Sequence, residues 1–323
     1  MYRTFKFSSP DGTALEGWTN DGKGPTIVVC NGLGVPPEAW PRLLDPECGY
    51  RVFSWNQRGT FGSQRPEDLE KIRIGDHVAD AFALMEEVGV DKAILVAWSY
   101  GVNISFEVAK QQPERIAGLV MCAGVPGGTL DSAFAPLLVP RAVRKPLSLA
   151  VANAGKLLGP QLNTLAKLLP KNNVTADIMR HTGLIMPTAK TEDIVPWLES
   201  FATHDFSWYF NMFPAAGEHE RMDPSFIEVP IAVAAGALDT LTSALDIVEF
   251  AEQIPHAEIH VLQGTHFIPL EFPDDVMNMI DSVVSKSELA DQMIKTHPAD
   301  VTSIHINETE VDIHHSNPLR QSS

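Results

Sequence analysis

The chain has 323 residues, of which 44% are hydrophobic and 20% are charged, values typical of a globular protein that buries a sizeable core. This length fits one large α/β domain or two ordinary domains. The net charge of −17 disfavours nucleic acid and anionic membrane surfaces as partners.

The first part of the chain alternates predicted strands and helices. Residues 4–7 and 14–18 flank Pro10-Asp11-Gly12, a turn that favours a β-hairpin. The following predicted elements are strands over 25–30 and 51–55, a helix over 74–88, a strand over 93–98, a helix to about 112 and a strand over 116–122. Most of these strands are apolar on both faces, which indicates a parallel sheet covered by helices on both sides.

The turn after strand 93–98 carries Ala97-Trp98-Ser99-Tyr100-Gly101. Small residues two places before and after a serine, between a strand and a helix, match the G-x-S-x-G nucleophile elbow. Such a turn strains the backbone of the serine and lifts its hydroxyl off the sheet. A helix N-cap also favours serine here, so the local pattern fits both roles and partner residues must decide between them.

From 124 to 229 the alternation stops. This segment has no clear strand and is rich in Leu and Ala, with helices expected over 150–158, 162–169 and 194–203. We expect most of these Leu and Ala side chains to be core. The segment as a whole is predicted to form a helical cap over one end of the sheet, where it would roof a pocket.

The alternation resumes with a strand over 231–236, a helix over 243–253, a strand over 258–262 and a helix over 273–284. We therefore divide the chain into a core of residues 1–123 and 230–285, a cap of residues 124–229, and a polar extension of residues 286–323. The extension is expected to be loosely attached or partly disordered. It holds four histidines whose spacing fits no ordinary metal site: His297, His305, His314 and His315.

Two candidate partners for Ser99 follow predicted strands, where catalytic groups of open α/β sheets lie. Asp239 comes after strand 231–236, and His266 follows the last strand. Taken singly, Asp239 also fits a helix N-terminal acid and His266 an ordinary loop histidine. Together, the order serine, aspartate, histidine, each at a strand's end, predicts a triad in which Asp239 orients His266 as the base for Ser99.

A tetrahedral oxyanion needs two preorganised N–H donors. The backbone N–H of Tyr100, the residue after the predicted nucleophile, is one candidate. The other is the N–H of Leu33, because Gly32 and Gly34 let the loop after strand 25–30 approach a substrate closely. A flexible glycine turn without this role explains the loop equally well.

With these motifs, residues 2 to about 285 resemble the α/β-hydrolase fold superfamily, in its serine-nucleophile branch with a helical cap between strands six and seven. The resemblance implies a mostly parallel eight-stranded sheet flanked by helices. It also implies that Ser99 is the nucleophile, that His266 acts as base and then as acid, and that Asp239 orients it.

The sequence departs from the family's pattern at three places. The oxyanion loop starts with Asn31-Gly32 instead of His-Gly, Asn56 replaces the usual acid before the Arg58-Gly59 turn, and Ala97 replaces the first elbow glycine. The first change makes the Leu33 donor less certain, the last is tolerated in the family, and Arg58 is interpreted as structural.

Ser99 argues against the branches that resemble haloalkane dehalogenases and epoxide hydrolases, which use aspartate at the elbow. The elbow also differs from the G-G-S-W-G of aminopeptidase-like branches. The resemblance thus implies acyl transfer through an acyl-enzyme, first of all carboxylic ester hydrolysis, with no metal or organic cofactor. Hydrolysis of a thioester, lactone or carbon–carbon bond, acyl transfer to another acceptor, and non-enzymatic ligand binding stay open.

The cap is the only guide to the substrate. Its apolar stretches and the aromatic run over 206–210 suggest a small-molecule ester-like substrate with an apolar acyl group, although core packing explains them equally well. The physiological substrate and the oligomeric state are open.

Three cysteines, Cys30, Cys48 and Cys122, form an odd set with no C-x-x-C spacing, which suits a reducing cytoplasm. Cys30 and Cys122 end apolar runs and are expected to be small buried hydrophobes. The first residues form no apolar signal segment, and no stretch approaches a membrane-spanning length. The chain is expected to be soluble and cytoplasmic.

Overall fold

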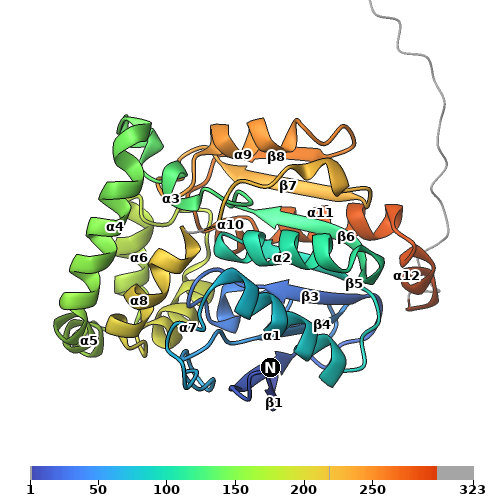
Figure 1. The fold of residues 1–323 in the computed structure, drawn as a ribbon, viewed down its shortest axis with the longest axis horizontal. Coiled ribbons are helices and arrows are strands. Elements are labelled where there is room, and N and C mark those ends of the chain that lie inside the picture. Colours follow the sequence, from blue (N-terminus) through green and yellow to red (C-terminus); the bar gives the residue numbers. More distant parts are fainter. Residues whose placement is uncertain (1, 218, 297–323) are drawn as a thin grey trace, which may run out of the picture.

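The computed structural model describes residues 2–217 and 219–296. An eight-stranded sheet with the strand order β1-β2-β4-β3-β5-β6-β7-β8 forms its centre (Figure 1). The strands are β1 (Arg3–Ser8), β2 (Ala14–Thr19), β3 (Thr26–Cys30), β4 (Arg51–Trp55), β5 (Ala93–Trp98), β6 (Ile116–Cys122), β7 (Ile231–Gly236) and β8 (Glu258–Leu262). Strand β2 runs antiparallel to β1 and β4, and the strands from β4 to β8 pair in parallel, which confirms the hairpin and the mostly parallel sheet.

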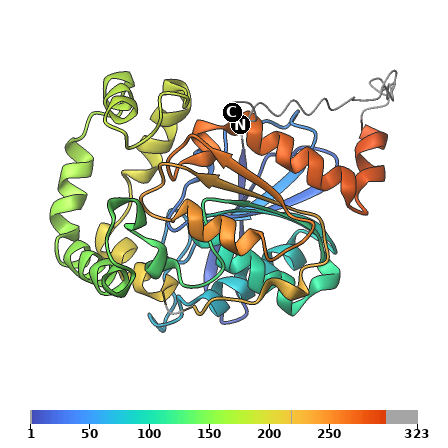
Figure 2. The ribbon, with the colours of Figure 1, turned by 90° about the horizontal axis from the view of Figure 1, so that it is seen from above.

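The central strands are apolar on both faces because helices cover both sides of the sheet (Figure 2). In β3, Val28 and Cys30 pack into one apolar cluster, whereas Ile27 and Val29 pack into another. Helices α1 (Ile74–Glu87), α2 (Tyr100–Gln111) and α9 (Ala244–Ala251) contribute to the first cluster, and α11 (Pro273–Lys286) contributes to the second. A strand buried on both faces is therefore a continuous apolar run in the sequence.

The strand order reverses at β3, which pairs with β4 on one side and with β5 on the other. In open α/β sheets such a reversal leaves a crevice beyond the carboxyl ends of the two strands. The loop after Cys30 and the turn at Ser99 both border this crevice.

The segment between β6 and β7 is helical, as predicted. Its helices are α3 (Thr129–Ser132), α4 (Arg141–Leu157), α5 (Gly159–Leu168), α6 (Asn173–His181), α7 (Thr191–Phe201) and α8 (Phe206–Ala216). Helix α4 begins well before the predicted residue 150 and runs through Pro146, which lies near its start. An interior proline removes one intrahelical hydrogen bond and crowds the preceding turn, but α4 continues through it.

The expectation that the Leu and Ala side chains of the cap are mostly core is wrong for α4 and α5. Leu157 is 79% exposed and Leu168 is 75% exposed. The face of α4 that packs inward carries small residues instead, with Ser148, Ala152 and Gly155 buried.

The cap joins the core through two paired segments, 126–128 and 219–222, which we call the neck. The Gly128 N–H donates to the His219 carbonyl (2.8 Å), and the Met222 N–H donates to the Pro126 carbonyl (3.1 Å). A Cβ atom at Gly127 would lie 1.9 Å from the Glu220 carbonyl oxygen, and the φ of Gly127 is +83°, so only glycine fits this approach.

The beginning of the predicted polar extension forms helix α12 (Ala290–Thr296). Leu289 is buried and Met293 packs against the cluster formed by α11. The four histidines His297, His305, His314 and His315 lie outside the described residues. No helix in the described ranges is both long and apolar enough to cross a bilayer.

All three cysteines are free, and Cys30 and Cys122 are fully buried as predicted. Burial raises the pKa of each of these two thiols to about 12. They therefore act as small hydrophobes in the sheet.

Arg58 is buried, and its contacts agree with the structural role predicted for it. Its guanidinium donates to both carboxylate oxygens of Asp80 (2.7 and 2.9 Å), to Ser9 Oγ (2.8 Å) and to the Lys71 carbonyl (3.0 Å), and it pairs with Asp11. Burial alone would raise the pKa of Asp80, but the hydrogen bonds and charge of Arg58 outweigh it and hold this pKa low. Arg58 thus ties the β1–β2 hairpin, the turn after β4 and α1 together.

The substitution Arg58→Met should lower the free energy of unfolding by about 3–5 kcal/mol, because it leaves the Asp80 carboxylate buried without its partner. Urea unfolding followed by circular dichroism measures this loss. The matched control is Arg42→Met, since Arg42 pairs with Asp274 at an exposed position and should matter little. Equal losses in the two variants would contradict the structural role of Arg58.

Candidate active site

Ser99 lies between the end of β5 and the start of α2 with a backbone φ of 55° and ψ of −117°. A left-handed φ is uncommon for a residue with a side chain and marks local strain. The strain follows from close packing, because a Cβ atom at Gly101 would lie 1.8 Å from the Cys30 carbonyl oxygen. The Ser99 side chain makes no N-cap hydrogen bond to α2, so it does not cap this helix; this decides against the helix N-cap interpretation.

The structure brings Ser99, His266 and Asp239 together. The Ser99 hydroxyl donates to His266 Nε2 at 2.8 Å, and His266 Nδ1 donates to Asp239 Oδ2 at 2.8 Å. Asp239 is completely buried, and its other carboxylate oxygen accepts the N–H groups of Leu241 and Thr242. The second oxygen thus holds the turn before α9 while the first holds the imidazole, so the carboxylate has a fixed orientation.

The loop that carries His266 is held by two residues, Trp98 and Glu271, whose roles sequence reasoning missed. Trp98 Nε1 donates to the His266 carbonyl at 2.7 Å. Glu271 is buried and accepts from the Thr265 N–H (2.7 Å), the Thr265 hydroxyl (2.5 Å) and the Met186 N–H of the cap (2.7 Å). The sequence signal that could have identified Glu271 is that it is the single acid within the apolar stretch 267–272, since a buried carboxylate must have hydrogen-bond partners.

The two predicted oxyanion donors are the N–H of Leu33, in the loop after β3, and the N–H of Tyr100, the residue after Ser99. Neither Leu33 N–H nor Tyr100 N–H has a hydrogen-bond partner within the described part of the chain. Gly32 lies against the nucleophile, because a Cβ atom there would be 3.5 Å from Ser99 Cβ. An oxyanion requires two such unpaired backbone donors.

Gln57 fixes the loop that contains Leu33. Its side chain accepts from the Gly34 N–H (2.8 Å) and donates to the Asn31 carbonyl (3.2 Å). The Asn31 side chain turns into the core, where it accepts from Trp40 Nε1 (2.5 Å) and donates to Ser54 Oγ (3.3 Å). Nothing in the local sequence pattern marked Gln57, because its role depends on the pairing of β3 and β4.

The cap packs directly on this loop. His204 Nε2 donates to the Gly34 carbonyl at 2.6 Å, and a Cβ atom at Gly34 would lie 2.8 Å from the Tyr209 ring. Trp208 is buried and donates through Nε1 to the Arg58 carbonyl at 2.8 Å. The Leu33 side chain packs against the apolar cluster that Trp208 forms in the cap. Much of the aromatic run over 206–210 therefore serves to dock the cap.

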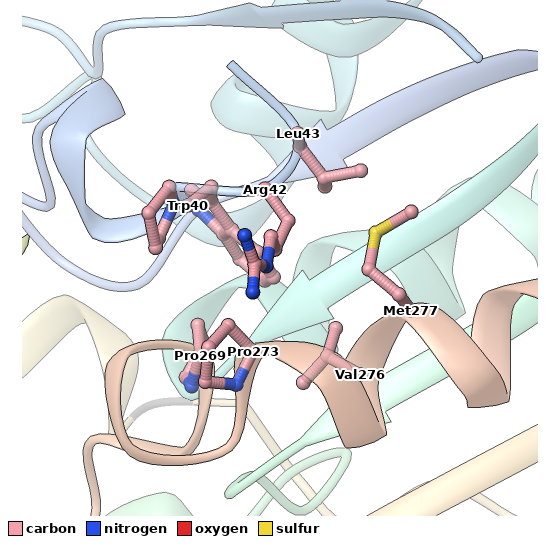
Figure 3. A pocket seen from close by; sticks show the side chains of 8 residues that line it. Trp40, Arg42, Leu43, Pro269, Pro273, Val276 and Met277 are labelled. Carbon is pink, nitrogen blue, oxygen red and sulfur yellow. The ribbon is translucent and has the colours of Figure 1, made fainter. Parts of the chain in front are cut away.

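Ser99 and Leu33 are partly exposed. A hollow lined by Trp40, Arg42 and Met277, among others, contains no triad residue and has a volume of about 10 Å³ (Figure 3). A larger cavity of about 260 Å³ lies beside Ile116 and Val229, at the amino-terminal end of β6, whereas Ser99 follows the carboxyl end of the parallel strand β5. Neither cavity belongs to the triad.

Residues 25–273 match the family described as alpha/beta hydrolase fold. The AB hydrolase superfamily protein YfhM of Bacillus subtilis is 28% identical over 120 residues, which is 36% of this chain and 42% of that protein. Epoxide hydrolase A of Mycobacterium tuberculosis is 29% identical over 99 residues, 29% of this chain and 30% of that protein. The alignments thus span less than half of these relatives.

Among solved structures, the enol-lactonase from Burkholderia xenovorans superposes with a TM-score of 0.64 at 20% identity. The superposition covers 87% of this chain and all of the enol-lactonase. At this identity the likeness supports the fold and not the substrate.

Replacing Glu271 by Gln should loosen the His266 loop, because the amide group then presents a donor to N–H groups that need an acceptor. We expect faster hydrogen exchange at Thr265 and Met186, measured by mass spectrometry. Glu252→Gln, at an exposed position, is the control and should leave both unchanged. Unchanged hydrogen exchange at Thr265 and Met186 in Glu271→Gln would contradict the role of Glu271 in positioning the His266 loop.

Burial lowers the pKa of His204. Since the unfolded state then takes up the proton first, the stability contributed by His204 is present above the usual pKa of about 6.5 and is lost as the pH falls below it. Between about pH 7.5 and pH 5, the wild type should lose more unfolding free energy than His204→Asn, which can still donate to Gly34 but does not titrate. Urea unfolding at both values measures this.

The matched control for His204 is His256→Asn. His256 Nε2 likewise meets a backbone carbonyl, that of Val229, but His256 is exposed. The His256 variant should keep the pH dependence of the wild type. If the His204 variant keeps it too, the buried imidazole does not couple cap docking to pH.

Proposed function

Because this chain belongs to the α/β-hydrolase fold family, we propose that it is a serine hydrolase that cleaves a carboxylic ester of a small, lipophilic molecule. The observation that carries this proposal is the hydrogen-bonded series Ser99–His266–Asp239, with 2.8 Å between each pair of bonded atoms. A serine hydroxyl becomes a nucleophile when a base removes its proton and an oriented carboxylate stabilises the charged base.

In the proposed mechanism, Ser99 Oγ attacks the ester carbonyl carbon while His266 Nε2 takes the hydroxyl proton. The negative charge that develops on the carbonyl oxygen is bound by the N–H groups of Leu33 and Tyr100. His266 then gives its proton to the departing alcohol, which leaves an acyl group on Ser99. A water molecule, deprotonated by His266, attacks the carbonyl carbon of this acyl-enzyme. His266 then returns the proton to Ser99 Oγ as the bond to the acyl group breaks and the acid leaves.

In this mechanism, Asp239 orients the imidazole of His266. The two carboxylate oxygens of Asp239 accept from His266 and from two backbone N–H groups, so the carboxylate is held in one orientation. It therefore fixes the imidazole tautomer with a proton on Nδ1 and leaves Nε2 free to accept. No metal or organic cofactor takes part in these steps.

An ester is favoured over the epoxide that the name of one relative suggests, since the elbow position holds Ser99 where the resemblance implies aspartate for epoxide hydrolases. An apolar acyl group is proposed from the apolar stretches and the aromatic run of the cap. Three free cysteines support a cytoplasmic location. The net charge of −17 favours small-molecule partners over nucleic acid.

Incubation with a fluorophosphonate probe should add a single adduct to the wild type and none to Ser99→Ala, as read by intact-mass spectrometry. Ser285→Ala, at an exposed serine on α11, is the control and should label like the wild type. With p-nitrophenyl esters of graded chain length, Ser99→Ala and His266→Ala should each lose on the order of 10⁴–10⁶-fold in turnover.

Three results would redirect the assignment. Equal turnover by the wild type and His266→Ala would refute the triad. Ester formation that outcompetes hydrolysis when an alcohol is added would identify an acyltransferase. A wild type that neither labels nor turns over any ester would favour a ligand-binding protein that has kept the fold.

A further inference from the structure

Helix α4 has the opposite polarity to a helix that packs on a hydrophobic core. Its buried face carries Ser148, Ala152 and Gly155, and a Cβ atom at Gly155 would lie 2.5 Å from the Phe210 ring of α8. Val143 and Val151 are 49% and 46% exposed, and helical spacing places both on one outward face. A helix in water alone would gain by turning these aliphatic side chains inward.

The exposed apolar surface continues into α5. Leu157 and Leu158 stand at the junction of the two helices, and Leu165, Leu168 and Leu169 follow at the spacing that forms one stripe. We call residues 137–171 the outer cap surface. Large exposed apolar patches of this kind mark interaction sites.

The charge of the outer cap surface is opposite to that of the whole chain. Between Asp131 and Asp177 there is no acidic residue, while Arg141, Arg144, Lys145, Lys156, Lys167 and Lys171 are all cationic. The chain as a whole has 24 Lys and Arg against 41 Asp and Glu. Arg144 is half-buried and donates to the carbonyls of Val139 and Asp131, so it faces α3 and not the outer surface. In the described ranges, Lys156 and Lys171 make exposed hydrogen bonds to neutral oxygens, so their positive charges are not neutralised.

The outer cap surface lies at one end of the molecule. Helices α4 and α5 form the extremity opposite to α12, as both views show (Figures 1 and 2). With its 17 residues, α4 spans about 25 Å. A flat partner can therefore reach this end without touching the acidic core.

We propose that the outer cap surface docks peripherally on an anionic lipid bilayer. The leucine and valine side chains enter the boundary between headgroups and acyl chains, and the lysine and arginine side chains bind lipid phosphates, as in amphipathic helices that lie in the plane of a membrane. This proposal is independent of the proposed ester hydrolysis, because binding requires no reaction at Ser99.

The net charge of −17 does not oppose this orientation. Charges separated by more than a Debye length of about 10 Å in 0.1 M salt are largely screened from each other. The electrostatic interaction with the bilayer is therefore determined mainly by the cations of the outer cap surface. Lysine and arginine can also lay their aliphatic stems along the apolar stripe while the charged ends reach the headgroups. A second copy of the outer cap surface would instead bring like charges together.

The test is co-sedimentation of the full chain with vesicles of phosphatidylcholine containing about 30 mol% phosphatidylglycerol, compared with pure phosphatidylcholine. We expect the wild type and Ser99→Ala to bind the anionic vesicles equally and the neutral vesicles at least about tenfold more weakly. The triple variant Leu157→Gln, Leu165→Gln and Leu168→Gln should lose at least about tenfold in binding to anionic vesicles. The double variant Lys145→Gln and Lys167→Gln should bind more weakly than the wild type.

The matched control is Leu69→Gln with Val261→Gln. These side chains are 53% and 52% exposed but lie outside the cap, so this variant should bind like the wild type. Because all the substituted leucines are exposed, the variants should keep the wild-type unfolding midpoint. Light scattering after size-exclusion chromatography reports the oligomeric state of each variant in parallel.

Four outcomes would overturn the proposal. They are absence of wild-type binding to anionic vesicles, equal binding to neutral vesicles, wild-type binding by the triple variant, and a wild-type dimer that the triple variant converts to a monomer. The last outcome would assign the surface to a second copy of the chain. None depends on esterase activity, so failure here and failure of the proposed function are distinguishable.

Discussion

The strained turn at Ser99 is the constraint on which the site depends. Its left-handed backbone arises because α2 starts directly against the end of β3, where there is no space for a side chain on Gly101. This contact is possible only because β3 and β5 are adjacent in the sheet. The same adjacency brings the glycine loop after β3 beside the serine, so one packing event places both the hydroxyl and the predicted oxyanion donors.

The cap and the predicted catalytic groups share their supports. His204 and Trp208 of the cap hold the backbone of the loop and turn after β3 and β4, and Glu271 binds both the His266 loop and the cap at Met186. Movement of the cap would therefore shift both the loop after β3 and the His266 loop. The side chains that couple them are buried and polar, so their geometry is fixed by hydrogen bonds as well as by packing.

Much of the fold could be predicted from the sequence because its strands are short apolar runs and its three candidate triad residues each follow such a run. Gln57 and Glu271 could not be predicted, since their partners are distant backbone groups that come close only in the folded sheet. The cap was predicted as helical, but its inward face was misjudged. Apolar periodicity identifies a helical face and does not say whether protein covers it, and in α4 the buried face is made of small residues.

The neck has a consequence for how this family member could change over evolutionary time. The segments 126–128 and 219–222 meet through backbone hydrogen bonds, so the ends of the whole inserted segment already lie together. Chain segments whose ends are adjacent can be exchanged or lengthened at small entropic cost to the host. Recombination at this junction could therefore exchange the inserted segment in one step, provided that the new segment again makes the contacts by which His204, Trp208 and Met186 hold the loops around Ser99.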